Sequence, residues 1–449
     1  MNRELLQFGQ SEQPRPEPLR RTAAPETTMM HNAIKAACEI WRYLAGEIRI
    51  SPRAVKVMGP NRTGLRLCSF SQRAVATVTG MLTSFDDFPI HQASVPMAHS
   101  ATPDINHYDR YFFNGYTSDG TLYFGLAMGL YPNRHVVDAA FSVIRDDRQL
   151  SVFASGRAPT DRRDATTVGP IRVEVVQPLH ILRLHVDAPE QGLRAELTFT
   201  ASSEAIEEPH FFQRIGVRVL FDYTRLTQFG AWTGWLEVDG QKVDLTESNV
   251  VGTRDRSWGV RPVGEPAPSG APVAIPQFFW LWAPVCFPEF STHFDVNEYG
   301  DGRRWHEVGA FCEHGQSAEM ARTVDYRVTW CPGTRWAATF EYDLVFWSGV
   351  VATVTLEPIS HFQMRGIGYG HPEWNHGSWR GESVVGGERI SLPVENPLLR
   401  EHLHVQTLCR ASYSDTTGRT SCGTGILEQL CVGEHPTGLH GILDGYSPS

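Results

Sequence analysis

From about residue 108 onward, short runs of alternating apolar and polar residues follow one another and end at turn-forming residues. Residues 235–238 and 242–245 alternate on either side of Asp239-Gly240, and residues 294–298 and 303–308 flank a second, glycine-containing turn. Alternation places successive side chains on opposite faces of a strand, and an Asp-Gly pair between two such runs indicates a hairpin. Pro or Gly interrupts most helical candidates. The pattern predicts an all-β chain of antiparallel strands.

Such strands extend over roughly 350 residues, which is more than one small barrel or sandwich requires. We therefore expect two β units. The segment 261–276 is rich in Pro, Gly and Ala and is the best candidate for the link between them.

Composition excludes several classes of protein. The 449 residues are 41% hydrophobic and 20% charged, as in ordinary globular proteins, and the net charge of −10 argues against a nucleic-acid partner. No apolar run reaches the roughly 18 residues of a membrane span, and the N-terminus has no apolar signal-peptide core. We therefore expect no integral membrane segment and a cytoplasmic location. The eight cysteines include no CxxC pair, which favours reduced packing thiols over a disulfide framework.

The first 80 residues differ from the rest of the chain. They hold 12 Lys/Arg against 6 Asp/Glu and lack sustained periodicity. One interpretation is a basic disordered arm. The preferred one is that Met81 is the natural start and that residues 1–80 are a spurious extension. Only three of the 40 basic residues are lysines, which favours a GC-rich bacterial coding sequence over special anion chemistry.

Residues 251–261 combine three arginines, an aspartate and a tryptophan directly after an alternating segment. In a strand, Arg254, Arg256 and Trp258 share one face, and Asp255 lies on the other. Charges at this density are costly to bury unless they are paired. Two interpretations stay open. The stretch is either an ion network that closes a barrel end and bridges the two halves, or a site in which Asp255, with a raised pKa, is a general acid.

Phe278, Trp280 and Trp282 alternate along the next apolar run and so share a face, which is either plain core or the wall of an apolar ligand cavity.

The strand that follows puts His293, Asp295 and Asn297 on one face, where solvent exposure is favoured over a polar pocket. Of the histidines, His293 is the preferred candidate for acid–base work.

Residues 366–377 form a second polar cluster, with His371, Glu373 and His376 close together. Their spacing matches no zinc pattern, so we expect no metal. A turn held by Gly, Pro and side-chain hydrogen bonds is favoured, with Tyr369 or His371 facing a cavity.

Two of these segments carry a resemblance to a known family. Residues 254–259, Arg-Asp-Arg-Ser-Trp-Gly, resemble the Asp-His-Asn-Trp-Gly signature of the carotenoid 1,2-hydratase (hydroxyneurosporene synthase) and AttH-like superfamily, and the aromatic run 279–282 follows at a similar interval. Residues 108–115 and 369–374 resemble an uncharacterised bacterial branch of that superfamily. Its start resembles residues 85–92, in keeping with Met81 as the start. The resemblance covers roughly residues 85–445.

The resemblance implies two lipocalin-like barrels with an apolar ligand between or within them. Hydratases of this family add water to an isolated C=C of an isoprenoid without a cofactor: a carboxylic acid protonates the alkene, and aromatics support the cation. Relatives include pericyclic and terpene-cyclising enzymes, and some resemble lipid carriers. Asp255 matches the signature aspartate, but Arg256 replaces its histidine and Ser257 its asparagine. We expect Arg256 to depress the pKa of Asp255, which puts carotenoid hydration in doubt.

The sequence thus predicts an all-β protein of two lipocalin-like antiparallel β-barrels packed together, with halves at 95–262 and 263–445. We expect it to bind a hydrophobic isoprenoid, steroid or polyketide-like small molecule and to catalyse acid-assisted hydration, isomerisation or cyclisation without a cofactor. The alternative is a non-catalytic lipid carrier, which gains support if Asp255 and His293 lie in ion pairs away from any cavity. A homodimer is left open.

The predicted catalytic residues are Asp255 and His293, and the predicted ligand-binding residues are Arg254, Arg256, Trp258, Trp280, Trp282, Asp295, Tyr369 and His371.

Overall fold

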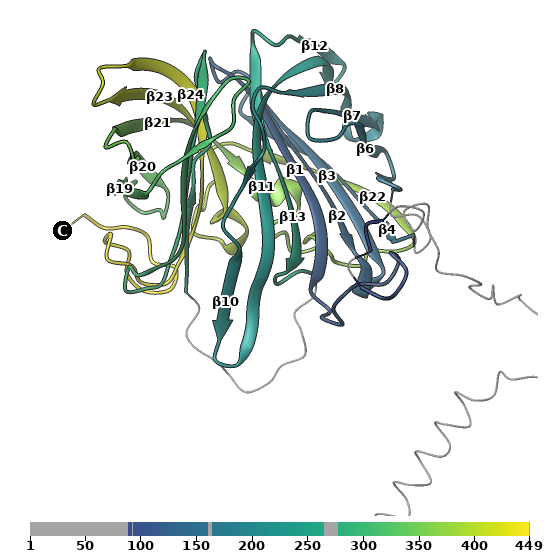
Figure 1. Ribbon diagram of the computed structural model, residues 1–449. Helices are drawn as coiled ribbons and strands as arrows, with labels where there is room; N and C mark the ends of the chain where they lie inside the picture. The colour runs from purple at the N-terminus through teal and green to yellow at the C-terminus, as the bar shows by residue number, and fades with distance from the viewer. Residues whose placement is uncertain (1–88, 92, 160–163, 265–276, 449) are drawn as a thin grey trace, which may run out of the picture. The chain divides into compact units, whose positions relative to one another are not determined.

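The computed structural model describes residues 89–91, 93–159, 164–264 and 277–448, which belong to one compact unit, Thr77–Ser449. The prediction for residues 1–80 and most of the expected link at 261–276 lie outside the described residues. Within them, regular structure consists of β-strands and short 3-10 turns, so the predicted all-β class is confirmed (Figure 1). None of the described helices is long and apolar enough to span a membrane.

The first barrel is a 14-stranded antiparallel sheet. Thirteen of its strands follow one another in the chain: β1 (His107–Thr117), β2 (Tyr123–Tyr131), β3 (Val136–Arg145), β4 (Arg148–Arg157), β5 (Thr167–Val168), β6 (Ile171–Gln177), β7 (Ile181–Ala188), β8 (Leu193–Ala201), β9 (Ile206–Glu207), β10 (Phe211–Ile215), β11 (Arg218–Val238), β12 (Gln241–Leu245) and β13 (Val250–Val260). The sheet runs β4-β3-β2-β1-β13-β11-β8-β7-β6-β5, and β3 and β4 also contact β5, so that it curls into a nearly closed barrel.

The second barrel is a 10-stranded antiparallel sheet, drawn in green to yellow in Figure 1. Its strands are β14 (Phe278–Trp282), β15 (Val285–Cys286), β16 (Phe290–Glu298), β17 (Arg304–Glu313), β18 (Glu319–Met320), β19 (Thr323–Trp330), β20 (Ala337–Val345), β21 (Val351–Gln363), β23 (Val405–Asp415) and β24 (Thr420–Val432). Near the two ends of the sheet, the backbone N–H of Ala321 donates to Gly309 at 2.8 Å, and β17 contacts β19. These contacts bring the ends of the sheet together.

One strand is exchanged between the barrels. The strand β22 (Ser383–Ser391) lies between β21 and β23 in the chain, but it pairs along its whole length with β4 of the first barrel. Figure 1 shows it crossing to the far edge of that sheet. The proposed boundary at residues 262 and 263 falls between β13 and β14, whereas β22, from the proposed second half, belongs by pairing to the first barrel. Its own sequence does not show which sheet it joins.

The expected hairpins are present. Asp239 and Gly240 join β11 to β12 with φ of 47° and 78°, the left-handed conformation that a tight two-residue hairpin turn requires. Residues 299–303 join β16 to β17.

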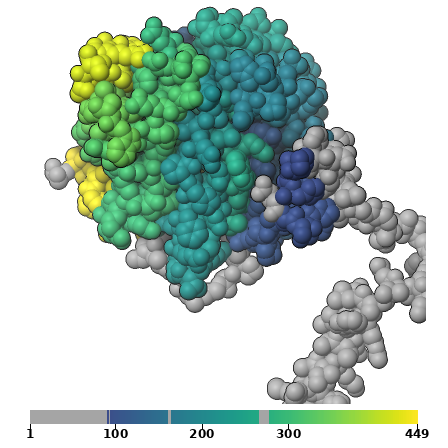
Figure 2. Space-filling view, viewed as in Figure 1, coloured from purple at the N-terminus to yellow at the C-terminus, as the bar shows by residue number. Residues whose placement is uncertain are grey.

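Three apolar layers hold the fold together. Phe113, Phe124, Phe199 and Trp232 pack edge to face inside the first barrel, and a second aromatic cluster fills the other barrel. A third layer, which includes Phe112, Trp282 and Ile367, lies between the barrels. The strands of both barrels lie directly side by side on the face drawn in Figure 2. The site described below lies at this third layer.

Trp232 anchors the first core, where its side chain is fully buried and its Nε1 donates to the Asn114 carbonyl at 2.9 Å. We expect Trp232→Ala to lower the free energy of unfolding by about 3–5 kcal/mol, because a large cavity replaces the indole. The matched control is Trp347→Ala, at a side chain that is 78% exposed, which should stay within about 0.5 kcal/mol of wild type. Urea denaturation measures both. Equal losses in the two variants would contradict this account of the core.

Candidate active site

The strand β13 separates the predicted site residues into two groups. Asp255 is in register with Phe112 on β1 and Thr227 on β11, and Phe112 packs on Trp282 of the second barrel at 6.4 Å between ring centroids. Asp255 therefore faces the second barrel. Arg254 is in register with Phe113, which belongs to the first barrel's core, so that Arg254 and Arg256 face the interior of the first barrel.

Asp255 is a half-buried carboxyl group without a hydrogen bond or an ion pair to any residue that the structure describes. Burial raises its pKa from 3.8 to about 6; the positive charge of Arg225 opposes this shift, and the negative charge of Glu428 adds to it. The expectation that Arg256 depresses this pKa is wrong. Arg256 lies across the sheet and forms an ion pair with Asp109 at 2.7 Å.

Aromatic and cationic side chains from both barrels surround this position. The ring centroid of His404 lies 5.7 Å from that of Trp280 and 5.0 Å from that of Tyr369. The phenol oxygen of Tyr369 accepts a hydrogen bond from Arg261 at 3.3 Å. Trp280, Tyr369 and Arg261 each keep part of their surface accessible, as Asp255 does, although they lie among strands of the two barrels.

His404 and Glu428 form a buried pair that the sequence interpretation missed. His404 Nε2 donates to Glu428 Oε1 at 2.6 Å, while Gln406 holds the other carboxylate oxygen at 2.5 Å. His404 Nδ1 has no hydrogen bond within the described part of the chain. A histidine fixed in this way keeps one nitrogen as a proton acceptor. The pair arises because β23 and β24 align Gln406 with Glu428, an alignment that pairing the two strands by sequence could have indicated.

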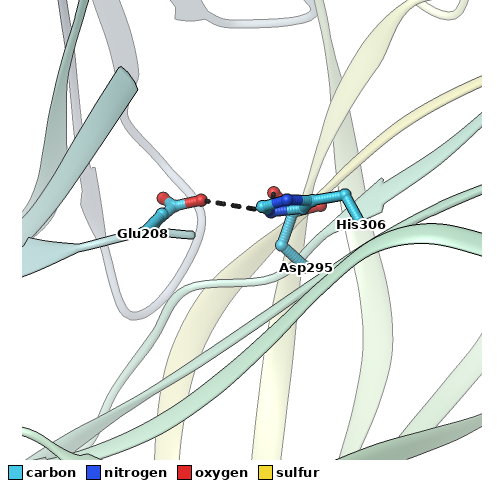
Figure 3. A group of neighbouring side chains, drawn as sticks. All are labelled: Glu208, Asp295 and His306. Carbon is cyan, nitrogen blue, oxygen red and sulfur yellow. Dashed lines mark ion pairs between the residues drawn. The ribbon is translucent and has the colours of Figure 1, made fainter. Parts of the chain in front are cut away.

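A buried ion cluster joins the barrels beside this position (Figure 3). Arg225 on β11 donates through Nε and Nη2 to the carboxylate of Glu208 at 2.9 and 2.6 Å, and also pairs with Asp295 on β16. Thr227 donates a further hydrogen bond to Glu208 at 2.6 Å. All of these side chains are buried. Arg225 also lies 5.8 Å from the ring centroid of Trp280, so the cluster adjoins the aromatic wall.

The charges within the cluster are divided unequally. Burial alone raises the pKa of Glu208, but the opposing charges of Arg225 and His293 outweigh it, and the pKa is lowered. Burial raises the pKa of Asp295 well above its usual range, and the Glu208 charge adds to this effect. Burial also lowers the pKa of His306 to about 3. The favoured expectation that His293, Asp295 and Asn297 face solvent is wrong: all three are buried.

His293 lies at this cluster, with Nε2 3.4 Å from Glu208 Oε1. Trp282 packs against it and is likewise buried.

The cluster also has the donor set of a metal site, because ligand atoms of Glu208, Asp295 and His306 lie within 4.8 Å of one another. The guanidinium of Arg225 is bonded to both carboxylates and supplies the positive charge between them. A cation would have to displace it, so these residues do not fit a metal in this arrangement.

Two predicted residues lie away from Asp255's surroundings. Trp258 is 40% exposed near the end of β13. His371 Nδ1 accepts hydrogen bonds from the backbone N–H groups of Glu373 and Trp374, and its Nε2 lies 3.6 Å from Glu388. His371 therefore stabilises a turn.

The chain belongs to a family of unknown function (DUF8625), which matches residues 82–440. No curated protein matches it.

Three solved structures are similar. They are a protein of Nitrosomonas europaea assigned as AttH (13% identity, 76% of this chain and 98% of that one, TM-score 0.44), kievitone hydratase of Nectria haematococca (11%, 78% and 95%, 0.47) and CghA (10%, 75% and 90%, 0.45). With every TM-score below 0.5, these likenesses carry no inference about this chain's chemistry.

We expect Arg225→Met to lower the free energy of unfolding by about 3–5 kcal/mol, because it leaves Glu208 and Asp295 buried without their cation. Arg327→Met is the matched control, because Arg327 also pairs with two carboxylates but is half exposed. It should cost at most about 1 kcal/mol. Chemical denaturation measures both. A loss for Arg225→Met no larger than for the control would contradict the role of the cluster.

Proposed function

We propose that this protein is a cofactor-free enzyme that binds a hydrophobic small molecule between its two barrels and protonates it with Asp255. The observation that carries the proposal is the state of Asp255: a half-buried carboxyl without an ion-pair partner in the described chain, whose pKa is raised to about 6. Such a group is partly protonated near neutral pH and can serve as a general acid. The isoprenoid, steroid or polyketide-like nature of the ligand is part of this proposal.

The chemistry follows from the groups around Asp255. Its proton adds to a C=C bond of the substrate, and the π electrons form the new C–H bond and leave a carbocation. The faces of Trp280 and Tyr369 stabilise that cation. In hydration, water bonds to the cation and its released proton passes to His404 Nδ1. In isomerisation, His404 takes a proton from the neighbouring carbon. In cyclisation, a second C=C of the substrate attacks the cation before that proton loss.

We assign the proton-accepting role to His404 rather than His293. His293 is fully buried beside Glu208, on the far side of the Arg225 ion cluster, and burial there separates it from the accessible surface that Asp255 retains. His404 instead packs against both Trp280 and Tyr369.

The alternative of a non-catalytic carrier draws support from His293, which lies at an ion cluster. It does not account for Asp255. A carrier requires no acid, and an unpaired carboxyl in a half-buried position has a cost that an apolar side chain would not incur.

Native mass spectrometry of the freshly purified protein is the first test, because it detects a co-purifying hydrophobic molecule. We expect the wild type to convert that molecule and Asp255→Asn to do so at least about 100-fold more slowly. The matched control is Asp244→Asn, at an exposed aspartate, which should retain the wild-type rate. Binding without conversion by the wild type would establish a carrier, and equal conversion by Asp255→Asn would remove Asp255 from the role.

The rate should also depend on pH. The reactive form is protonated Asp255, so kcat should fall about tenfold per pH unit above the pKa of about 6. A profile that is flat between pH 6 and 8 would be inconsistent with a proton from this group.

A further inference from the structure

The interior of the first barrel contains a buried cation that no carboxylate neutralises. Arg254 is 2% exposed and projects from β13 into the barrel, on the face opposite to Asp255. No described carboxylate forms an ion pair with it. Burial lowers its pKa to about 10, with Arg256 adding to the effect, so the guanidinium remains charged at neutral pH. An isolated buried charge is costly unless it is paired, which points to an anionic partner.

The guanidinium is oriented by a fixed acceptor. Arg254 Nε donates to Gln228 Oε1 at 2.8 Å, and this is its only side-chain hydrogen bond within the described residues. The amide nitrogen of Gln228 donates to the carbonyls of Leu179 and Ser203 at 2.8 and 2.9 Å, which fixes its oxygen toward Arg254. Both terminal nitrogens of Arg254 thus remain without an acceptor in the described chain. Two parallel N–H groups at the end of an arginine match the two oxygens of a carboxylate.

The neighbouring space is a small cavity with a net positive charge. It has a volume of about 50 Å³, and its lining includes Arg256, Tyr111, Met128 and Val137. Arg256 is paired with Asp109 and stacks over Tyr111 at 4.2 Å, so that its own charge is already balanced. The charge of Arg254 therefore remains in excess. A water molecule needs about 10–15 Å³ of such volume, so the cavity has room for a small organic anion.

We propose that the first barrel binds a small monocarboxylate, with the carboxylate held end-on by the terminal nitrogens of Arg254 and its short apolar body beside Tyr111, Met128 and Val137. This site is separate from the proposed active site, because the backbone of β13 lies between Arg254 and Asp255. Its occupancy does not depend on whether Asp255 is catalytic.

The test uses acetate and propionate, with acetamide and sodium chloride at equal ionic strength as controls. The melting temperature of the wild type should rise saturably with either carboxylate, with a dissociation constant on the order of millimolar for ligands of this size. It should not respond in this way to acetamide, which has nearly the same shape but no charge. An equal response to acetamide, or no saturable response to the carboxylates, would overturn the proposal.

Variants locate the binding. Arg254→Gln should weaken the carboxylate response at least tenfold, whereas Arg172→Gln, at an exposed arginine, should leave it unchanged. In chloride alone, Arg254→Met should be at least as stable as the wild type, because it removes an unpaired buried charge. Isothermal titration with Arg254→Lys provides a second variant that keeps the charge but loses the planar pair of donors, and it too should bind at least tenfold more weakly. Unchanged affinity in Arg254→Gln and Arg254→Lys would place the anion elsewhere and overturn the proposal.

Discussion

The ion pairs of Arg225 with Glu208 and Asp295 connect the two barrels, and the arrangement of the candidate active site depends on them. The apolar layer between the barrels supplies most of the attraction, but apolar contacts are non-directional and do not by themselves specify one relative orientation. A buried arginine that donates to carboxylates on β16 and beside β9 does, because any shift would leave a buried charge unpaired. This geometry fixes the Trp280 and His404 side of the second barrel opposite Asp255.

The chemical properties of β13 follow from strand alternation. One face of the strand gives the inter-barrel layer an acid with a raised pKa, and the other gives the first barrel's interior an arginine without a counter-ion. Adjacent residues in the sequence are therefore on opposite sides of a sheet, with different solvation and different partners. A single densely charged segment thus contributes to two chemically distinct environments.

Local patterns in the sequence predicted the β class, the hairpin at Asp239-Gly240 and the separation of Asp255 from Arg254 and Arg256. These depend on a two-residue period and on turn chemistry, which are local. The exchange of β22, the His404–Glu428 pair and the Arg225 cluster arise from strand pairing and barrel packing, which local patterns do not encode. The expected effect of Arg256 on the pKa of Asp255 was wrong for a related reason: sequence adjacency was taken as spatial proximity, although the sheet separates the two side chains.

The central claim is that Asp255 retains its proton close to neutral pH because of where β13 places it. Carbon-13 NMR of protein labelled at the aspartate side-chain carboxyl measures this directly, with Asp255→Asn assigning the resonance. We predict a titration midpoint near 6 for Asp255. A midpoint close to the ordinary value of 3.8 would contradict the account, because the group would then be fully ionised at neutral pH and could not act as the proton donor.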